Sequence, residues 1–206
     1  MPESTVYCSY APGAGKTTYM LKRAVRDKGD GRVVSFDFVY DSGRPSLNLI
    51  ENDESRCLRK EAFFDPKAII AAHPQITVLD ELMMTNRFTH KPLYRSFREI
   101  ADNQIAVYTT TNLIHVRSLN QKYRKTARIF SEATVADRTF LTLGKLIFID
   151  IEPELLWSRY ARDELFPKHR KEFLLTYSIE RLSQCRALCL DFLGQLHSEQ
   201  YEIVQV

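Results

Sequence analysis

The residues from Ala11 to Thr17, Ala-Pro-Gly-Ala-Gly-Lys-Thr, have the composition of a loop that binds a chain of phosphates. Small residues let backbone N–H groups close around phosphate oxygens at the positive end of the following helix. In such a loop Lys16 reaches the terminal phosphates as a mobile cation, and the Thr17 hydroxyl is a ligand for Mg²⁺. The residues expected to bind the nucleotide phosphates form one run: Pro12, Gly13, Ala14, Gly15, Lys16, Thr17 and Thr18.

One position of this loop departs from the usual pattern. The G-x-x-x-x-G-K-[ST] motif has a glycine where this chain has Tyr10. A phenol ring there is expected to crowd the start of the loop, which argues against a bound nucleotide without arguing against the fold. A glycine-rich turn that merely caps a helix is the alternative. The apolar strand before the loop and the helical pattern after it favour the phosphate loop.

A pair of acidic residues, Asp80 and Glu81, follows the apolar run Ile76–Leu79. A carboxylate at the end of such a strand is typical of the Walker B position, so Asp80 is predicted to hold Mg²⁺ together with Thr17. Glu81 is a candidate catalytic residue that orients or deprotonates a water molecule. The alternative is a strand that simply ends in solvent, and only the nearby phosphate loop favours the functional interpretation.

Polar residues also follow the next apolar run, Ile105 to Thr110. Ligands of open parallel sheets lie beyond the carboxyl ends of the strands, so Thr110 and Asn112 are predicted to contact the terminal phosphate. Ordinary turn chemistry explains the same residues nearly as well. His90 and His115 lie on the same side of the predicted sheet, and we interpret both as structural rather than as phosphate acceptors.

The elements that position these residues alternate between strand and helix, which predicts a P-loop NTPase-like α/β fold, a mostly parallel sheet with helices on both faces. A helix is expected to open at Asp65-Pro66, with Asp65 as its cap. We place a boundary near residue 152, between a nucleotide-binding core (1–152) and a C-terminal helical extension (153–206). The tail from Tyr201 to Val206 reads either as a natural end or as a strand that awaits a partner. The expected strands are Thr5–Cys8, Val33–Tyr40, Ile76–Leu79, Ile105–Thr110 and Leu146–Ile151.

The composition excludes several other classes of protein. Hydrophobic residues make up 44% and charged residues 27% of the chain, as in a folded globular protein. A net charge of +3 gives no argument for a nucleic-acid partner, and no apolar run is long enough to insert into a membrane. The N-terminus has no signal-peptide pattern, and the four cysteines have no disulfide or metal spacing. We therefore expect a cytoplasmic protein with reduced thiols.

Beyond these generic motifs, the chain resembles the N-terminal cytoplasmic domain of the KdpD family of osmosensitive potassium-channel sensor histidine kinases. The resemblance runs from about Tyr7 to Leu193, and His90 contributes to it. Its specific strings are Asp-Glu-Leu-x-x-Thr-Asn from Asp80 and Tyr-Thr-Thr-x-Asn-x-x-His-x-x-Ser-Leu-Asn from Tyr108. It implies a regulatory ATP- and Mg²⁺-binding domain in potassium and turgor signalling by a two-component system. The implied partner is a histidine kinase domain or another signalling protein, and the chain is either a fragment or a free-standing version.

Some polar residues of that family are replaced here. Tyr10, Tyr40, Ser42 and Met84 stand where small, acidic or histidine residues are usual in the family. These losses remove candidates for catalysis and for ligand sensing while the scaffold is retained. Three functions therefore stay open: a regulatory module that signals by nucleotide-dependent contact, a slow ATPase or small-molecule kinase, and a degenerate phosphate loop that acts only through protein contacts.

Overall fold

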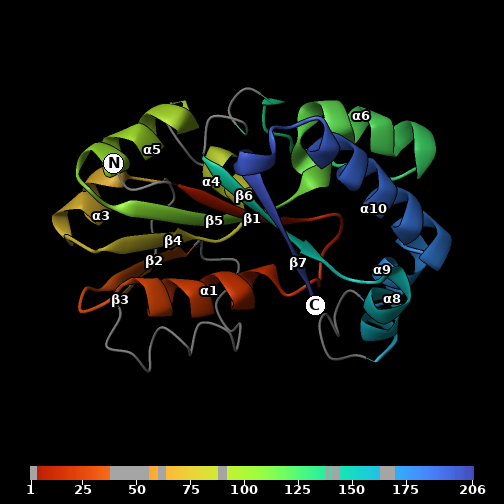
Figure 1. Ribbon diagram of the computed structural model, residues 1–206, viewed down its shortest axis with the longest axis horizontal. Coiled ribbons are helices and arrows are strands. Elements are labelled where there is room, and N and C mark those ends of the chain that lie inside the picture. Colours follow the sequence, from red (N-terminus) through yellow and green to blue (C-terminus); the bar gives the residue numbers. More distant parts are fainter. Residues whose placement is uncertain are drawn as a thin grey trace.

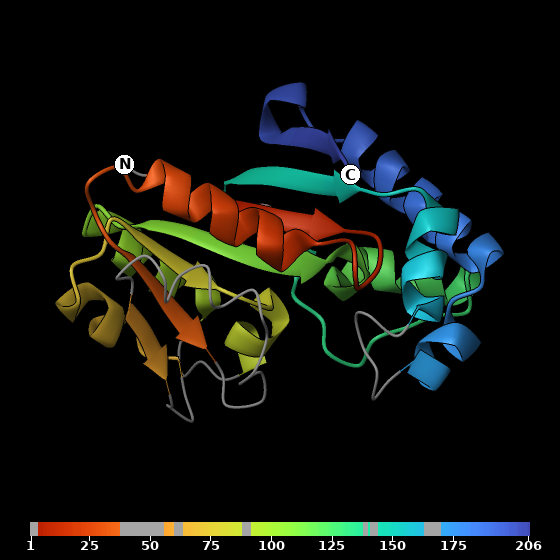
Figure 2. The same ribbon diagram turned by 90° about the horizontal axis from the view of Figure 1, so that it is seen from below.

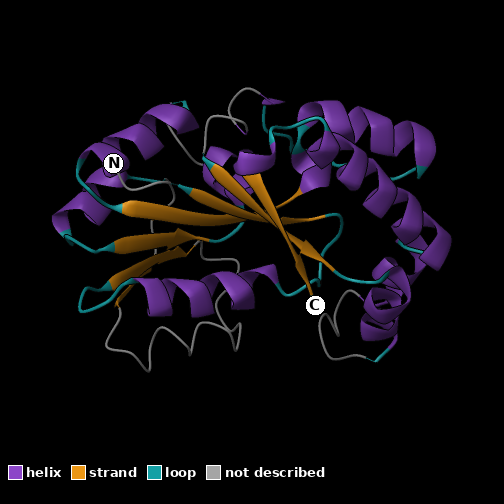
Figure 3. Ribbon diagram, viewed as in Figure 1, coloured by secondary structure: helices purple, strands orange, loops and turns teal. Residues whose placement is uncertain are grey.

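The computed structural model describes residues 4–37, 56–59, 64–87, 92–137, 140, 144–162 and 170–206. Among these residues, seven strands form one sheet in the order β3-β2-β4-β5-β1-β6-β7, with helices on either side (Figures 1 and 3). In chain order the elements are β1 (Thr5–Ser9), α1 (Lys16–Asp27), β2 (Val33–Asp37), β3 (Arg56–Arg59), α3 (Pro66–Ala71), β4 (Ile76–Leu79), α4 (Leu82–Arg87), α5 (Leu93–Asp102), β5 (Ala106–Asn112), the 3₁₀ turn η3 (Leu113–His115), α6 (Arg117–Thr126), β6 (Lys145–Asp150), α8 (Pro153–Ala161), α9 (Arg170–Thr176), α10 (Ile179–Gly194), the 3₁₀ turn η4 (Ser198–Gln200) and β7 (Tyr201–Gln205).

The predicted α/β class is confirmed, because every neighbouring pair of strands in the sheet is parallel. Strand β4 is buried along its whole length, as expected for a strand with helices on both faces. Helix α1 packs over β1, β5 and β4 on one face, and α3 and α5 lie on the opposite face (Figures 1 and 2). Strand β1 thus lies between β5 and β6, which places the loop that follows it near the middle of the sheet edge.

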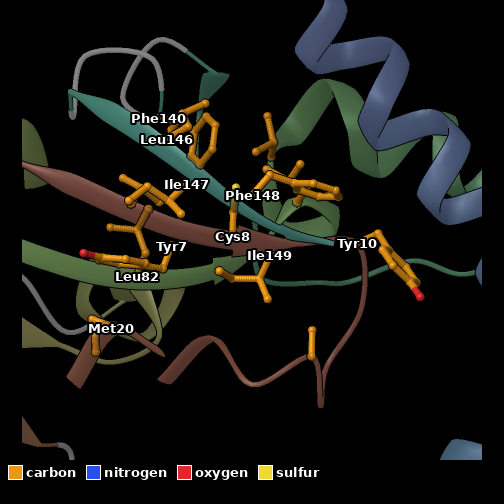
Figure 4. Packing of buried hydrophobic residues seen from close by; sticks show 14 of the residues in the cluster. Tyr7, Cys8, Tyr10, Met20, Leu82, Phe140, Leu146, Ile147, Phe148 and Ile149 are labelled. Carbon is orange, nitrogen blue, oxygen red and sulfur yellow. The ribbon is translucent and has the colours of Figure 1, made fainter. Parts of the chain in front are cut away.

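Part of the core surrounds β1 and β6, where Figure 4 shows buried aromatic and aliphatic side chains of several elements. Phe148 of β6, Met20 of α1 and Leu82 of α4 are each completely buried there. Burial also raises the pKa of the Cys8 thiol to about 12, in keeping with a reduced cysteine that only packs. Cys185 and Cys189 of α10 are likewise free, buried thiols.

Several predicted boundaries shift by one or two residues. Strand β5 continues beyond Thr110 to Asn112 because its ladder with β1 extends to the pair Ser9–Asn112. The helix expected at Asp65-Pro66 is present, and the Asp65 carboxylate accepts a hydrogen bond of 2.9 Å from the N–H of Lys67. The strand predicted from Val33 is described as far as Asp37, and the remainder of the predicted run lies outside the described residues.

The C-terminal part of the chain contributes both helices and a strand. Helices α8, α9 and α10 pack on one another, and α10 also packs on α6. The tail is a strand, β7, but its partner is in the same chain: β7 pairs in parallel with β6, from Leu146–Tyr201 to Asp150–Gln205. The two segments that we separate near residue 152 therefore share one sheet.

A buried ion pair fixes α10 to this edge of the sheet. The guanidinium of Arg186 donates to both carboxylate oxygens of Asp150, at 2.7 and 2.8 Å, and to Glu152 at 2.7 Å. The Gln205 amide donates to the same Asp150 carboxylate at 2.9 Å, and the N–H of Val206 donates to the Asp150 carbonyl at 3.0 Å. The Asp150 side chain is only 2% exposed, so these bonds supply the partners that its buried charge requires.

Candidate functional site

The loop between β1 and α1 has the backbone of a phosphate-binding turn. Gly13 and Gly15 have positive φ angles of 85° and 90°, a conformation that only glycine adopts without strain. Gly15 is also the N-cap of α1, and as a glycine it has no side chain that could cap the helix. The first N–H groups of α1 point along the helix axis, where the helix dipole favours an anion.

Tyr10 does not crowd this loop, so that expectation is wrong. Its side chain is completely buried, and its hydroxyl donates a hydrogen bond of 2.9 Å to the carbonyl of Ile151, just beyond β6 (Figure 4). The hydroxyl of Tyr123 in turn donates to the Tyr10 carbonyl at 2.9 Å. The ring therefore lies in the core beside the end of β6, where the usual glycine has no side chain.

Lys16, the first residue of α1, lies close to the end of β5. Its ammonium Nζ donates to the side-chain oxygen Oδ1 of Asn112 at 2.7 Å, and the lysine side chain is almost fully buried. Asn112, predicted as a phosphate contact, is thus a direct neighbour of the predicted phosphate-binding cation.

The predicted metal ligands Thr17 and Asp80 also lie together. The Thr17 hydroxyl donates to Asp80 Oδ1 at 2.9 Å, and the Thr110 hydroxyl donates to the same oxygen. Thr110 in addition accepts a hydrogen bond of 2.9 Å from the backbone N–H of Glu81. Three elements, α1, β4 and β5, therefore bring hydroxyl and carboxylate oxygens to one point beside Lys16.

Glu81 follows this cluster with an unusual backbone. Its φ of 61° is in the left-handed region, which a non-glycine residue occupies at a cost. The hydrogen bond from its N–H to Thr110 fixes this conformation. Its side chain is half-buried at the start of α4.

His115 behaves as a structural residue, as the sequence suggests. Its ring nitrogen Nδ1 lies 2.9 Å from the Ala133 carbonyl, so Nδ1 carries the proton and donates. Burial lowers its pKa to about 4, and the nearby charge of Lys16 adds to this effect. A neutral imidazole therefore fixes the segment after α6 to η3. His90, Tyr40 and Ser42 lie outside the described residues, as does the side chain of Met84.

Two residues of α8 that the sequence analysis did not identify contact the loop. Arg159 Nη1 donates to the Gly13 carbonyl at 3.2 Å, and the Tyr160 hydroxyl donates to the Pro12 carbonyl at 2.6 Å. These contacts join positions 146 and 148 residues apart, and neither residue belongs to a motif. The remaining predicted loop residues are Ala14, which is buried, and Thr18, which is exposed on the first turn of α1.

The chemistry of these groups fits a nucleotide phosphate with a hard divalent cation. Main-chain N–H groups and Lys16 suit phosphate oxygens, while the hydroxyl and carboxylate oxygens of Thr17 and Asp80 are donors that Mg²⁺ prefers. No group of three or more His, Cys, Asp and Glu side chains gathers as a metal site in the part of the chain that the structure describes. Thr17 and Asp80 would hold a magnesium ion together with phosphate oxygens, as is usual for this ion.

Comparison with known proteins identifies relatives of this chain. The family model for the osmosensitive K⁺ channel His kinase sensor domain, KdpD, matches residues 2–195. The chain is 28% identical to the sensor protein KdpD of Clostridium acetobutylicum over 80% of its length, 29% identical to that of Mycobacterium tuberculosis over 83%, and 26% identical to that of Escherichia coli over 78%.

The matched region covers 19% to 21% of the length of these three relatives. None of the helices in the described ranges is both long and apolar enough to cross a membrane. A match over residues 2–195 includes the phosphate loop, Asp80, Asn112 and α8 together. The chain belongs to the KdpD family of osmosensitive K⁺ channel His kinase sensor domains.

Proposed function

We propose that this chain is a regulatory module that binds Mg-ATP and signals, through a nucleotide-dependent contact, to a histidine kinase domain or another protein of a potassium- and osmosensing two-component system. The observation that carries the proposal is the 2.7 Å bond between Lys16 and Asn112. It joins the cation of the phosphate loop to the last residue of a central strand. Because an ammonium group has three N–H donors, a phosphate bound by the loop and Asn112 can share the same cation.

The residues around this bond have separate roles in the proposal. The first N–H groups of α1 and Lys16 bind the phosphates, and Thr17 and Asp80 hold the cation. Bound Mg²⁺ would supply charge neutralisation between the phosphate oxygens. Thr110 orients Asp80, because its hydroxyl contacts the Asp80 carboxylate and the Glu81 backbone.

A chain of contacts leads from Asn112 to the surface and supports the signalling part of the proposal. Asn112 directly precedes η3. In this turn the ring nitrogen Nδ1 of His115 bonds to the Ala133 carbonyl at 2.9 Å, and the backbone carbonyl of His115 accepts a hydrogen bond of 2.7 Å from the N–H of Val135. Val116 also pairs with Val135 in an isolated bridge. A change at Asn112 is therefore expected to reach the segment 131–137, in which the Glu132 side chain is exposed to a partner.

A slow ATPase is the second candidate, and the conformation of Glu81 favours it. Glu81 directly follows Asp80, and its backbone has a positive φ. Local backbone strain of this kind is concentrated at functional sites. The hydrogen bond to Thr110 fixes this residue next to the proposed metal ligands.

Thermal unfolding with and without Mg-ATP tests the main proposal. At a hundredfold excess over its dissociation constant, ATP stabilises a protein by about 2.7 kcal/mol. For a chain of this size that corresponds to a rise in melting temperature of roughly 5–10 °C. The rise should be absent in Lys16→Ala and unchanged in Lys22→Ala, which removes an exposed lysine of the same helix. If the wild-type chain shows no rise, the proposal is wrong and the degenerate interaction module is favoured.

A further inference from the structure

Helix α8 is fixed to the phosphate loop by two consecutive side chains. Arg159 bonds to the Gly13 carbonyl at 3.2 Å and Tyr160 to the Pro12 carbonyl at 2.6 Å. Tyr160 is itself held in an aromatic cluster, with ring centroids 5.1 Å from Phe173 and 5.8 Å from Tyr177. The position of Arg159 relative to the loop is therefore well determined by its neighbour.

The hydrogen-bonding capacity of Arg159 is largely unused within the described residues. A guanidinium group has five N–H donors, and the bond from Nη1 to the Gly13 carbonyl uses one of them. The bond to Gly13 fixes the planar guanidinium group at one nitrogen, and the Arg159 side chain is half-buried. Such a plane can stack on an aromatic ring.

The sheet order indicates which part of a nucleotide lies near Arg159. Asp80, Thr110 and Asn112 follow β4 or end β5, on one side of β1, and these residues suit the terminal phosphate and the cation. Strand β6 and the helix α8 that follows it lie on the other side of β1. Because the triphosphate chain is extended, a nucleotide with its terminal phosphate on the β5 side directs its sugar and base toward α8.

We propose that Arg159 is a base-contacting residue whose guanidinium plane stacks on the purine of a nucleotide bound at residues 12–18. This inference rests on the nucleotide-binding function proposed above and adds a site for the base. One N–H remains on the Gly13 carbonyl, so the plane is pre-oriented and little side-chain freedom is lost on binding.

Calorimetric titration with Mg-ATP and with Mg-tripolyphosphate tests this assignment, since the second ligand has the phosphates but no base. In Arg159→Ala the dissociation constant for ATP should rise about tenfold or more, in line with the loss of one stacking contact. The constant for tripolyphosphate should change less than about twofold, because the base contact makes no contribution to it. Arg162→Ala, which removes an exposed arginine three residues further along, should affect neither ligand.

A second variant distinguishes the loss of the base contact from a general effect of the substitution on the phosphate loop. Arg159→Lys keeps the charge and a donor for Gly13 but lacks the plane, so it should lose ATP affinity and keep that for tripolyphosphate. Equal losses for the two ligands in both variants, or no loss at all, would overturn the base contact. A wild-type chain that binds tripolyphosphate as tightly as ATP overturns it too, while the phosphate site stands. Binding of neither ligand removes the proposed function and this inference with it.

Discussion

The ammonium nitrogen of Lys16 and the amide oxygen of Asn112 lie 2.7 Å apart, although the two residues are separated by 96 positions in the chain. The bond joins the first residue of α1 to the last residue of β5, and both side chains are buried. A hydrogen bond that involves a buried charge contributes more than one between neutral groups. This pair therefore couples the stability of the domain to the geometry of the phosphate loop.

Replacement of Asn112 by alanine should lower the free energy of unfolding by about 1.5–3 kcal/mol, because a buried charge loses a hydrogen-bond acceptor. Urea denaturation measures this change. Gln121→Ala, which removes an exposed amide of α6, serves as control and should change it by less than about 0.5 kcal/mol. Equal effects of the two substitutions would show that the Lys16 contact contributes nothing specific.

Asp80→Asn should abolish the dependence of ATP binding on Mg²⁺. The substitution removes the negative charge of the Asp80 carboxylate, which contacts the Thr17 and Thr110 hydroxyls and is expected to attract the cation. Titration of the variant with ATP should give the same dissociation constant with Mg²⁺ and with a chelator. Asp102→Asn, on the exposed end of α5, should retain the Mg²⁺ dependence of the wild type.

Glu81→Gln tests the ATPase candidate without removing any proposed phosphate contact. If Glu81 acts as a general base, phosphate release should fall by about 100-fold or more while the dissociation constant for ATP is unchanged. Glu154→Gln, on the exposed face of α8, is the matched control. Wild-type phosphate release no faster than that of Glu81→Gln would exclude this candidate.

His115 should make the domain less stable in mild acid. Its pKa is about 4 in the folded chain, mainly because of burial, against an ordinary value near 6.5 in the unfolded chain. Between these values the unfolded chain binds the extra proton, so the free energy of unfolding falls as the pH decreases from about 6.5 to 4. The full loss amounts to about 3 kcal/mol.

Urea denaturation at several pH values between 7 and 4 measures that slope. In His115→Gln the contribution of this residue to the slope should disappear, whereas His73→Asn, at an exposed turn, should keep the wild-type slope. A His115→Gln variant with an unchanged slope would assign the acid sensitivity to other groups.

Arg186→Ala should destabilise the domain strongly. The substitution leaves the Asp150 carboxylate, 2% exposed, without its cationic partner, and loss of one member of a buried pair typically costs about 3–5 kcal/mol. Chemical denaturation of this variant and of Arg98→Ala, which removes an exposed arginine of α5, provides the comparison. A cost below about 1 kcal/mol would mean that Gln205 and solvent suffice for Asp150.

The parts of the fold around the candidate site that the sequence predicts correctly are those determined by local rules. The apolar run before the loop predicts the strand that ends there, and the apolar spacing after the loop predicts the helix. The meeting of Asp80 and Thr110 follows from the geometry of parallel strands, whose carboxyl ends share one edge. Both inferences need only the identity and order of the elements.

The remaining features depend on tertiary packing, which no local pattern encodes. The position of Tyr10 in the motif predicts that its ring crowds the loop, whereas its hydroxyl bonds to the carbonyl of Ile151, 141 positions away. Arg159 and Tyr160 contact the loop only because α8 packs beside it. The sequence also does not predict that β7 pairs with β6, because nothing in a short terminal strand indicates which strand it will lie beside.

Strand β7 lies beyond residue 195, where the match to the family model ends, yet it pairs with β6, a strand within that match. Without β7 the apolar run Leu146–Ile149 of β6 would form the margin of the sheet, with unpaired backbone groups open to another chain. The tail presents Glu202 at that margin instead, and Glu202 is bound to Lys145 at 2.9 Å. Strand β7 therefore takes the edge position of the sheet from β6, and its short length and the ion pair between Lys145 and Glu202 are features that disfavour the addition of a further strand.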